Sequence, residues 1–288
     1  MTAPAAPLSR RLEAMTLRLT AQSVNAAASP NVRFAWPARP APDRLAMSEA
    51  LLPLAGHPLL RELDDEQRWH LALVEAVHFF SLNIAGEREL LAGLAARLEG
   101  DTPLIVSRYL RHFLDEENAH TAVFTRFCLD YGGRIFQDRQ VRFPQVFLPG
   151  EADFLFFAQA LVFEEIAHFY NRQQAADDAL WTLARDINRY HAEDEARHIA
   201  FGRVFVADLW ERFGAQWNPE EKRRIGGYLS RYIQAVQRSY VNEEVYRTLG
   251  LPDTIRDEIL ASAHWTALAE KSAREITRWL RLVGVTGQ

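Results

Sequence analysis

The stretch NRYHAEDEARHIAFGR (residues 188–203) places two histidines and three acidic residues within eight positions of a segment that we expect to be helical. An α-helix turns about 100° per residue, so Glu195 lies about 40° from His191, and His198 lies about 20° from His191 on the other side. These three side chains therefore share one face, while Glu193 points away. A single cluster of this kind is typical of a charged, solvated helix edge. Features elsewhere in the sequence are needed to distinguish that interpretation from a metal site.

The composition is that of a globular protein with no basic surface. The 288 residues are 48% hydrophobic and 25% charged, with a net charge of −5 and a pI near 6.0. This balance argues against nucleic-acid binding. The single cysteine, Cys128, excludes an internal disulfide and suits a reducing compartment. The SRR near the N-terminus is followed by no continuous apolar stretch, and no run approaches a membrane span. We expect a cytoplasmic protein with no membrane partner.

Helical periodicity begins at about residue 64. Residues 65–98 contain no proline and carry apolar residues at helical spacing. The sequence EGDTP (99–103) interrupts this pattern, and we expect Asp101 to cap the N-terminus of the next helix. That second helix is predicted to end near Tyr131, before a Gly-Gly pair. The two helices form a predicted hairpin.

A second predicted hairpin follows a long connection. Residues 132–153 contain glycine and proline, and two further helical patterns cover about 152–175 and 178–213. No stretch shows convincing strand-like alternation. Two helical hairpins joined by one long connection fit an all-α fold, a ferritin-like four-helix bundle.

We expect one domain over residues 1–288. Its predicted parts are an N-terminal segment (1–63), a four-helix core (64–213) and a set of C-terminal helices (214–288). The N-terminal segment is rich in alanine and proline, so we expect it to wrap on the body as an irregular or short-helical chain. The C-terminal helices are predicted at about 218–248, 253–263 and 264–283.

Candidate metal ligands recur at matching places in the two hairpins. In each, a glutamate on the first helix lies about as far before the turn as an E-x-x-H pair lies after it, so all lie at similar heights. Each pair follows its upstream glutamate by 30 or 31 residues. The six residues are Glu87, Glu117, His120, Glu164, Glu195 and His198. One glutamate from each of two helices and one E-x-x-H from each of the others is the ligand set of carboxylate-bridged di-metal bundles.

The stretch HAEDEARH (191–198) adds a third histidine, His191, one turn before Glu195. With this addition the chain resembles the N-oxygenase family typified by p-aminobenzoate N-oxygenase. The resemblance covers about residues 69–203 and also LLPLAGHP (51–58). It implies a site of two Fe ions per chain, with Mn as an alternative, and O₂ as co-substrate. The implied ligands are Glu87, Glu117, His120, Glu164, His191, Glu195 and His198.

Two of these ligands have neighbouring rivals. Glu89 lies close to Glu87 in the sequence, Glu75 lies further up the same predicted helix, and Glu165 adjoins Glu164. The matching heights in the two hairpins favour Glu87 and Glu164. The alternatives stay open from the sequence alone.

Three further residues are candidates for contacts to the ligands. Glu116 and Asp194 each precede a ligand glutamate, so either could hydrogen-bond a ligand histidine or lie on the surface. His168 lies one turn after Glu164 and is a candidate for the same supporting role. We assign no metal-binding role to His57, His70, His78, His112 and His264.

In the resembled family, a di-iron site oxidises an amine with O₂ to a hydroxylamine, nitroso or nitro product. The resemblance therefore implies an amine N-oxygenase in small-molecule biosynthesis. The alternative is a di-iron oxygenase that performs C–H hydroxylation, desaturation or oxidative cleavage on a small or carrier-bound substrate. A third interpretation, an iron-storage or scaffold protein, fits less well because the N-terminal segment and C-terminal helices favour an enclosed pocket.

The same resemblance implies the partners. We expect a small-molecule amine substrate and an external electron donor similar to ferredoxin or a flavin reductase. A tethered substrate would add a carrier protein. A homodimer follows from the family resemblance alone.

Overall fold

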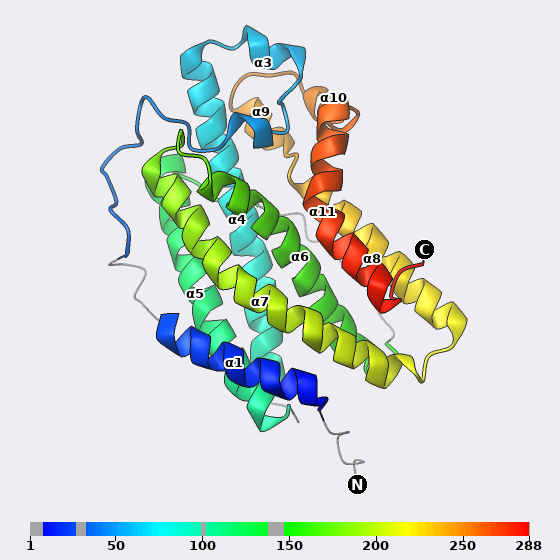
Figure 1. Cartoon of the computed structure of the whole chain (residues 1–288). Helices are drawn as coiled ribbons and strands as arrows, with labels where there is room; N and C mark the ends of the chain where they lie inside the picture. Colours follow the sequence, from blue (N-terminus) through cyan, green and yellow to red (C-terminus); the bar gives the residue numbers. More distant parts are fainter. Residues whose placement is uncertain (1–7, 27–32, 99–101, 138–146, 288) are drawn as a thin grey trace.

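Four long helices form the body of the molecule (Figure 1). The computed structural model describes residues 8–26, 33–98, 102–137 and 147–287, and within these ranges it contains helices and no strand. The four are α4 (Asp65–Leu98), α5 (Leu104–Gly132), α6 (Glu151–Ala175) and α7 (Thr182–Gly214). Helix α4 packs mainly on α5 and α6 mainly on α7, and α4–α6 and α5–α7 contacts close the bundle. The expected ferritin-like order of two hairpins and one long connection is confirmed.

Two glycines fix the ends of the long connection between the hairpins. Gly133 terminates α5 with φ of 63°, a left-handed conformation that favours glycine, and its N–H bonds the Cys128 carbonyl. Gly150 precedes α6 with φ of 74°, and a Cβ there would lie 2.1 Å from Phe213 Cγ. Glycine is therefore required twice at this position, by the backbone angle and by the phenyl ring. The predicted N-cap of α5, Asp101, lies outside the described residues.

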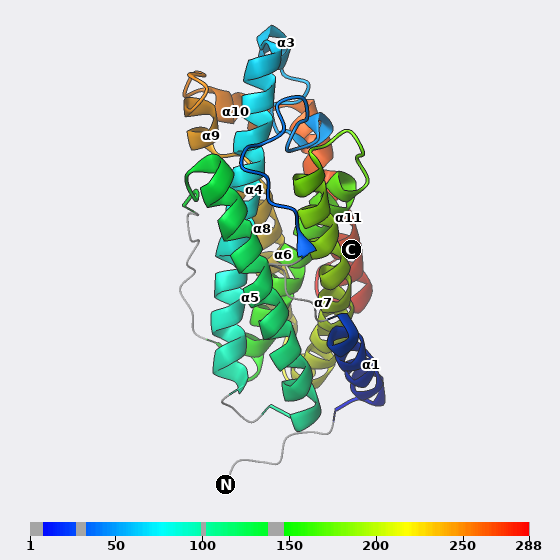
Figure 2. The ribbon, with the colours of Figure 1, turned by 90° about the vertical axis from the view of Figure 1, so that its left-hand side faces the viewer.

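The N-terminal segment contains more helix than expected. Helix α1 (Arg10–Ala26) has 17 residues and packs against α5 and α7 (Figure 1, Figure 2). Two short elements follow, η1 (Glu49–Leu51) and α3 (Pro58–Glu62). The chain near η1 is fastened to the α6–α7 turn, because Ser48 Oγ donates to Asp177 Oδ2 at 2.6 Å and Trp181 N–H donates to the Leu45 carbonyl at 2.9 Å. The prediction of an irregular or short-helical segment is therefore wrong for residues 10–26.

The C-terminal helices cover one side of the bundle. They are α8 (Pro219–Ser239), α9 (Glu243–Arg247), α10 (Ile255–Leu260) and α11 (Ala263–Val283), of which α8 and α11 pack on α6. The single helix predicted over 218–248 is divided, since Asn242 caps a new helix by accepting a hydrogen bond from Glu244 N–H. In the described part of the chain, no helix combines the length and the apolar character needed to cross a membrane.

Candidate metal centre

All seven predicted ligands converge in the middle of the four-helix bundle. Each of the seven is at most 4% exposed. They come from all four core helices: Glu87 (α4), Glu117 and His120 (α5), Glu164 (α6), and His191, Glu195 and His198 (α7). The helical spacing accounts for this convergence, because residues three, four and seven positions apart share a helix face.

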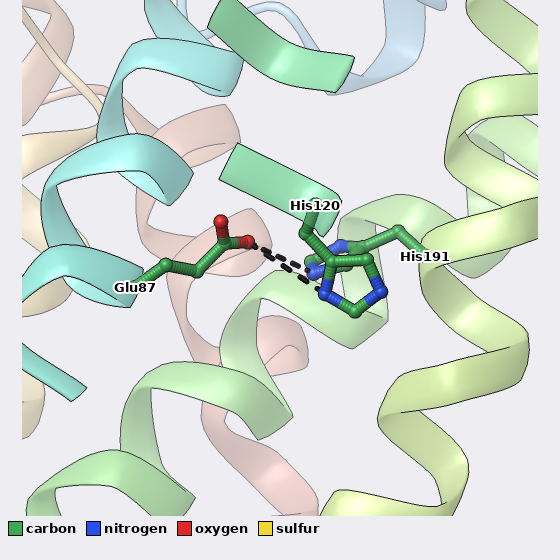
Figure 3. A group of neighbouring side chains, drawn as sticks. All are labelled: Glu87, His120 and His191. Atoms are coloured by element: carbon green, nitrogen blue, oxygen red, sulfur yellow. Dashed lines mark ion pairs between the residues drawn. The ribbon is translucent and has the colours of Figure 1, made fainter. Parts of the chain in front are cut away.

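Glu87, His120 and His191 form one group (Figure 3). The Glu87 Oε1 atom lies 3.4 Å from His191 Nε2 and 4.0 Å from His120 Nδ1. One ligand atom from each residue lies within 4.8 Å of the others. Thr121 donates a hydrogen bond of 2.9 Å from its hydroxyl to Glu87 Oε2, which turns the other carboxylate oxygen toward the histidines.

Glu117, Glu164 and His198 form a second group of the same kind. Glu117 also groups with His120 and Glu195, so its carboxylate lies between the two halves. Glu195 Oε1 likewise lies 2.9 Å from His191 Nε2 and 3.5 Å from His198 Nδ1. The arrangement thus offers two adjacent positions for cations, with two carboxylates within reach of both.

The chemistry of these donors fits a pair of divalent cations. Six buried oxygen and nitrogen atoms that could bind a metal have no hydrogen-bond partner: Glu87 Oε1, Glu117 Oε1, Glu164 Oε1, Glu195 Oε2, His120 Nδ1 and His198 Nδ1. His198 Nδ1 and Glu117 Oε1 are 2.8 Å apart without the angles of a hydrogen bond. Unpaired buried polar atoms are rare and costly, and cations would satisfy all six at once. Carboxylate and imidazole donors in this ratio suit Fe or Mn.

Burial and mutual repulsion raise the pKa of two of the four carboxylates, Glu87 and Glu164, whereas the neighbouring histidines outweigh burial and hold the pKa of each of the other two, Glu117 and Glu195, below its ordinary value. Burial, with a further contribution from the Glu117 charge, raises the pKa of Glu87 to about 7. Burial and the charges of Glu195 and Glu117 raise the pKa of Glu164 well above its ordinary value. Such repulsion between buried carboxylates is relieved by cations bound between them.

Two of the histidines are held from outside by acids. Asp194 Oδ2 lies 3.0 Å from His120 Nε2, and Glu116 Oε2 lies 2.7 Å from His198 Nε2. A proton on each Nε2 leaves the Nδ1 lone pair directed at the carboxylates, the usual arrangement of metal-binding histidines. Burial would raise the pKa of Glu116 and Asp194, but their hydrogen bonds outweigh it and the pKa of each lies below its ordinary value.

The third histidine, His191, has an amide partner that sequence reasoning missed. The Asn171 side-chain amide lies 2.5 Å from His191 Nδ1, and Asn171 is fully buried. The amide atom nearest to the ring is Asn171 Nδ2; a rotation of the amide by 180° would present its oxygen instead, which would accept the Nδ1 proton and leave the Nε2 lone pair facing Glu87 and Glu195. A signal was present, since Asn171 follows Glu164 by seven residues, which puts the two on one helix face about 20° apart.

The rivals of the predicted ligands lie elsewhere. Glu89 is exposed on α4, where it lines a cavity beside the cluster but belongs to none of the metal-binding groups. Arg203 binds both oxygens of Glu165 at 2.6 and 2.8 Å, which holds that carboxylate away from the cluster. His168 is half-buried, and its Nδ1 has no hydrogen-bond partner. Burial lowers the pKa of His168 to about 4. His168 Nδ1 therefore does not make the expected hydrogen bond to a ligand.

A cavity of about 680 Å³ opens beside the cluster, between α4, α6 and α8. Glu87, Glu164 and Glu195 are among the residues that line it, and its walls combine apolar side chains with polar and charged ones. The wall residues closest in sequence to these ligands are Gly86 and Phe163. His78, to which we assigned no role, also lines the cavity. A small organic molecule in this space would lie against the carboxylates.

No curated protein sequence matches the chain. Among solved structures, an R2-like ligand-binding oxidase mutant with an aerobically reconstituted Mn/Fe cofactor is similar, with a TM-score of 0.48, 15% identity, and 94% of each chain covered. A second mutant of that oxidase, with the cofactor anaerobically reconstituted, has a TM-score of 0.46, 14% identity, and 94% of each chain covered.

One family model matches almost the whole chain. It is described as P-aminobenzoate N-oxygenase AurF, and it covers residues 10–284. The match includes all seven predicted ligands and the helices that surround them. The chain therefore belongs to the p-aminobenzoate N-oxygenase AurF family, and it is a di-metal oxygenase.

Proposed function

We propose that this protein is a di-iron amine N-oxygenase that uses O₂ and an external electron donor to convert a primary amine into a hydroxylamine, nitroso or nitro product. The carrying observation is the buried cluster of four carboxylates and three imidazoles beside a 680 Å³ cavity. Family membership supports the choice of the amine nitrogen as the atom that is oxidised. We also propose that residues 1–288 act as one oxygenase domain.

The proposed ligands divide between two positions. Glu87, His120 and His191 would hold one ion, and Glu164 and His198 the other. Glu117 and Glu195 would contact both ions. A bound iron pair would supply the electrons that reduce O₂ and the site of oxygen transfer.

The residues around the ions would prepare the site for this chemistry. Glu116 and Asp194 keep the protons of His198 and His120 on the outer nitrogens, so the inner nitrogens remain free to bind. The apolar side chains in the cavity wall would contact the substrate and help to orient it. Phe163 lies in this wall beside Glu164, so its ring is placed to contact a substrate that reaches the ions.

The test combines metal content with product identity. We expect two irons per chain after expression with iron, a transient visible absorption when O₂ meets the reduced protein, and oxidised nitrogen in products from a library of primary amines. Glu87→Ala should lower the iron content, whereas the matched variant Glu89→Ala should leave two irons per chain.

Two outcomes would contradict the proposal at different levels. Absence of stoichiometric metal in a folded wild-type protein would refute the metal centre. Two irons with products oxidised only at carbon would keep the metal centre and assign the enzyme to C–H hydroxylation, desaturation or oxidative cleavage instead.

A further inference from the structure

Arg197 contacts two acids, each of which contacts a histidine at one of the two proposed metal positions. Its Nη2 atom donates to Glu116 Oε1 at 2.7 Å and to Asp194 Oδ1 at 2.6 Å. The second oxygen of Glu116 lies 2.7 Å from His198 Nε2, and that of Asp194 lies 3.0 Å from His120 Nε2. One nitrogen atom of Arg197 is thus connected to two proposed ligand histidines, through one carboxylate each.

The two carboxylates are crossed between the helices. Glu116 lies on α5, beside Glu117, and contacts a histidine on α7. Asp194 lies on α7 and contacts His120 on α5. Each E-x-x-H pair is therefore preceded by an acid that serves the histidine of the other pair. Such a crossed pair fixes the two helices relative to each other at the level of the cluster.

The crossed acids share one cation. Arg197 lies immediately before His198, whereas the equivalent residue before His120 is Ala119. Without the guanidinium, the two carboxylates would lie side by side with no positive charge between them, and they would repel each other. A rotation of either carboxylate would release the imidazole that it holds.

The position of this contact makes it stronger than an ordinary surface ion pair. The side chains of Arg197, Glu116 and Asp194 are 14%, 15% and 8% exposed. Hydrogen bonds between charged groups gain strength where solvent is largely excluded, whereas exposed pairs contribute little. Helices α5 and α7 also contribute buried apolar residues to the core, so this contact is not the only interaction that holds them in place.

We infer that Arg197 is a positioning residue that fixes the imidazoles of His120 and His198 at once, by clamping Glu116 to Asp194. This inference rests on the proposed metal centre. It predicts a specific pattern. Loss of Arg197 weakens the binding of both ions, whereas loss of either acid mainly weakens the binding of the ion held by the histidine that this acid contacts. Partners of this kind commonly change metal affinity by about 10- to 100-fold.

The experiment is an anaerobic titration of metal-free protein with Fe(II), and with Co(II) as a spectroscopic probe. Arg197→Met should weaken the binding of both ions by about tenfold or more. Glu116→Ala and Asp194→Ala should each weaken mainly one ion. Arg197→Lys should recover part of the affinity, because a single nitrogen makes both contacts. Circular dichroism of each metal-free variant checks its fold, and the lysine and acid variants carry the test if the methionine variant does not fold.

The matched control is Arg212→Met, also on α7. Arg212 Nε lies 2.8 Å from the buried Asp208, and neither residue belongs to the proposed metal-binding groups. Wild-type affinity for both ions in Arg197→Met, or an equal loss in Arg212→Met, would overturn the inference while leaving the metal centre intact. A wild-type protein that binds no pair of ions would refute the metal centre and this inference together.

Discussion

At the scale of single residues, the amide of Asn171 contacts His191 Nδ1, and we expect this contact to orient the ring toward the cluster. A ring that lost this partner would be free to rotate or to carry its proton on Nε2, the nitrogen directed at Glu87 and Glu195. We therefore expect Asn171→Leu to lower the affinity for the ion near His191 by about tenfold or more, measured by Fe(II) titration of the metal-free protein.

Gln174→Leu is the control for this substitution. Gln174 is also buried on α6, where it donates a hydrogen bond of 3.1 Å to Asn188. Its loss should lower the free energy of unfolding by about 1–3 kcal/mol without changing metal affinity. Equal metal affinities in Asn171→Leu and the wild type would show that packing alone orients His191.

The residues that sequence reasoning found are those with local periodicity. The E-x-x-H pairs and His191 were predictable because three-, four- and seven-residue spacings place side chains on one helix face. Asn171 and Arg197 were missed for a different reason. Asn171 shares a helix face with Glu164, but its partner His191 lies on α7, and the spacing within α6 does not reveal that contact. Arg197 follows Asp194 by three residues, but its second partner, Glu116, lies on α5.

At the scale of the helices, α4 and α6 approach closely where α4 carries glycine. A Cβ on Gly86 would lie 2.3 Å from Phe163 Cζ, and one on Gly93 would lie 1.9 Å from Phe156 Cε2. We expect Gly86→Ala to displace the Phe163 ring. The cost of overpacking, about 1–3 kcal/mol, should exceed the helix propensity gain of about 1 kcal/mol. Denaturant unfolding would measure the net loss, and a changed KM would report the altered cavity wall.

Gly227→Ala on α8 provides the matched comparison. Its nearest atom would be Arg231 Nη1 at 3.5 Å, an ordinary contact. This variant should gain up to about 1 kcal/mol of stability, since alanine favours the helix. If both alanine variants gained stability equally, the close packing of Phe163 on α4 would not constrain the fold.

The N-terminus of α6 supplies a pH-dependent contribution. Glu151 is buried and accepts hydrogen bonds from Leu148 N–H at 2.9 Å and Arg224 Nη2 at 2.7 Å. Burial would raise the pKa of Glu151, but these bonds outweigh it and lower the pKa below the ordinary value of 4.5. The unfolded chain therefore binds this proton more readily than the folded one, so the contribution to stability is fully present above pH 4.5 and is lost as the pH falls through the folded value.

Glu151→Gln should be less stable than the wild type near neutral pH. This difference in unfolding free energy should shrink on acidification below pH 4.5, measured by denaturant titrations at a series of pH values. A difference that stayed constant with pH would mean that the Glu151 charge contributes nothing.

The elements themselves were predictable to different degrees. Helices α4 to α7 follow from long apolar periodicity. Helix α1 was missed because its buried stripe includes Thr16, Thr20 and Ser23, which read as polar in the sequence. The two threonine hydroxyls donate hydrogen bonds to carbonyls one turn earlier, at 2.8 and 2.9 Å. Both hydroxyls are therefore buried with a hydrogen-bond partner. The division between α8 and α9 has no proline or glycine to mark it, only the cap at Asn242.

At the scale of the whole molecule, the cluster joins four helices, and burial disfavours the charged forms of two of its carboxylates, Glu87 and Glu164, by raising the pKa of each. The heights of the ligands in the two hairpins were predictable from the sequence because the bundle is regular. The cavity was not, since α8 forms one of its walls and its packing on α6 has no signature in the ligand motifs. The proposed function thus depends on the repeated ligand spacing, which the sequence reveals, and on the cavity, which only the folded structure reveals.

The same arrangement couples metal binding to global stability. The unfolded chain cannot assemble seven ligands from four helices, so an ion that binds only the folded state stabilises it by mass action, by about 2.7 kcal/mol for one site at 100 times the Kd. We expect the Tm of metal-free protein to rise with Fe(II) concentration under anaerobic conditions, and chelation to reverse the rise.

Glu117→Ala, which removes a carboxylate within reach of both positions, should flatten this dependence. Glu193→Ala should preserve it, because Glu193 is exposed and pairs with Arg33 outside the cluster. A Tm independent of Fe(II) in the wild type would mean that the folded chain does not bind Fe(II) in preference to the unfolded chain, and this would contradict the metal centre.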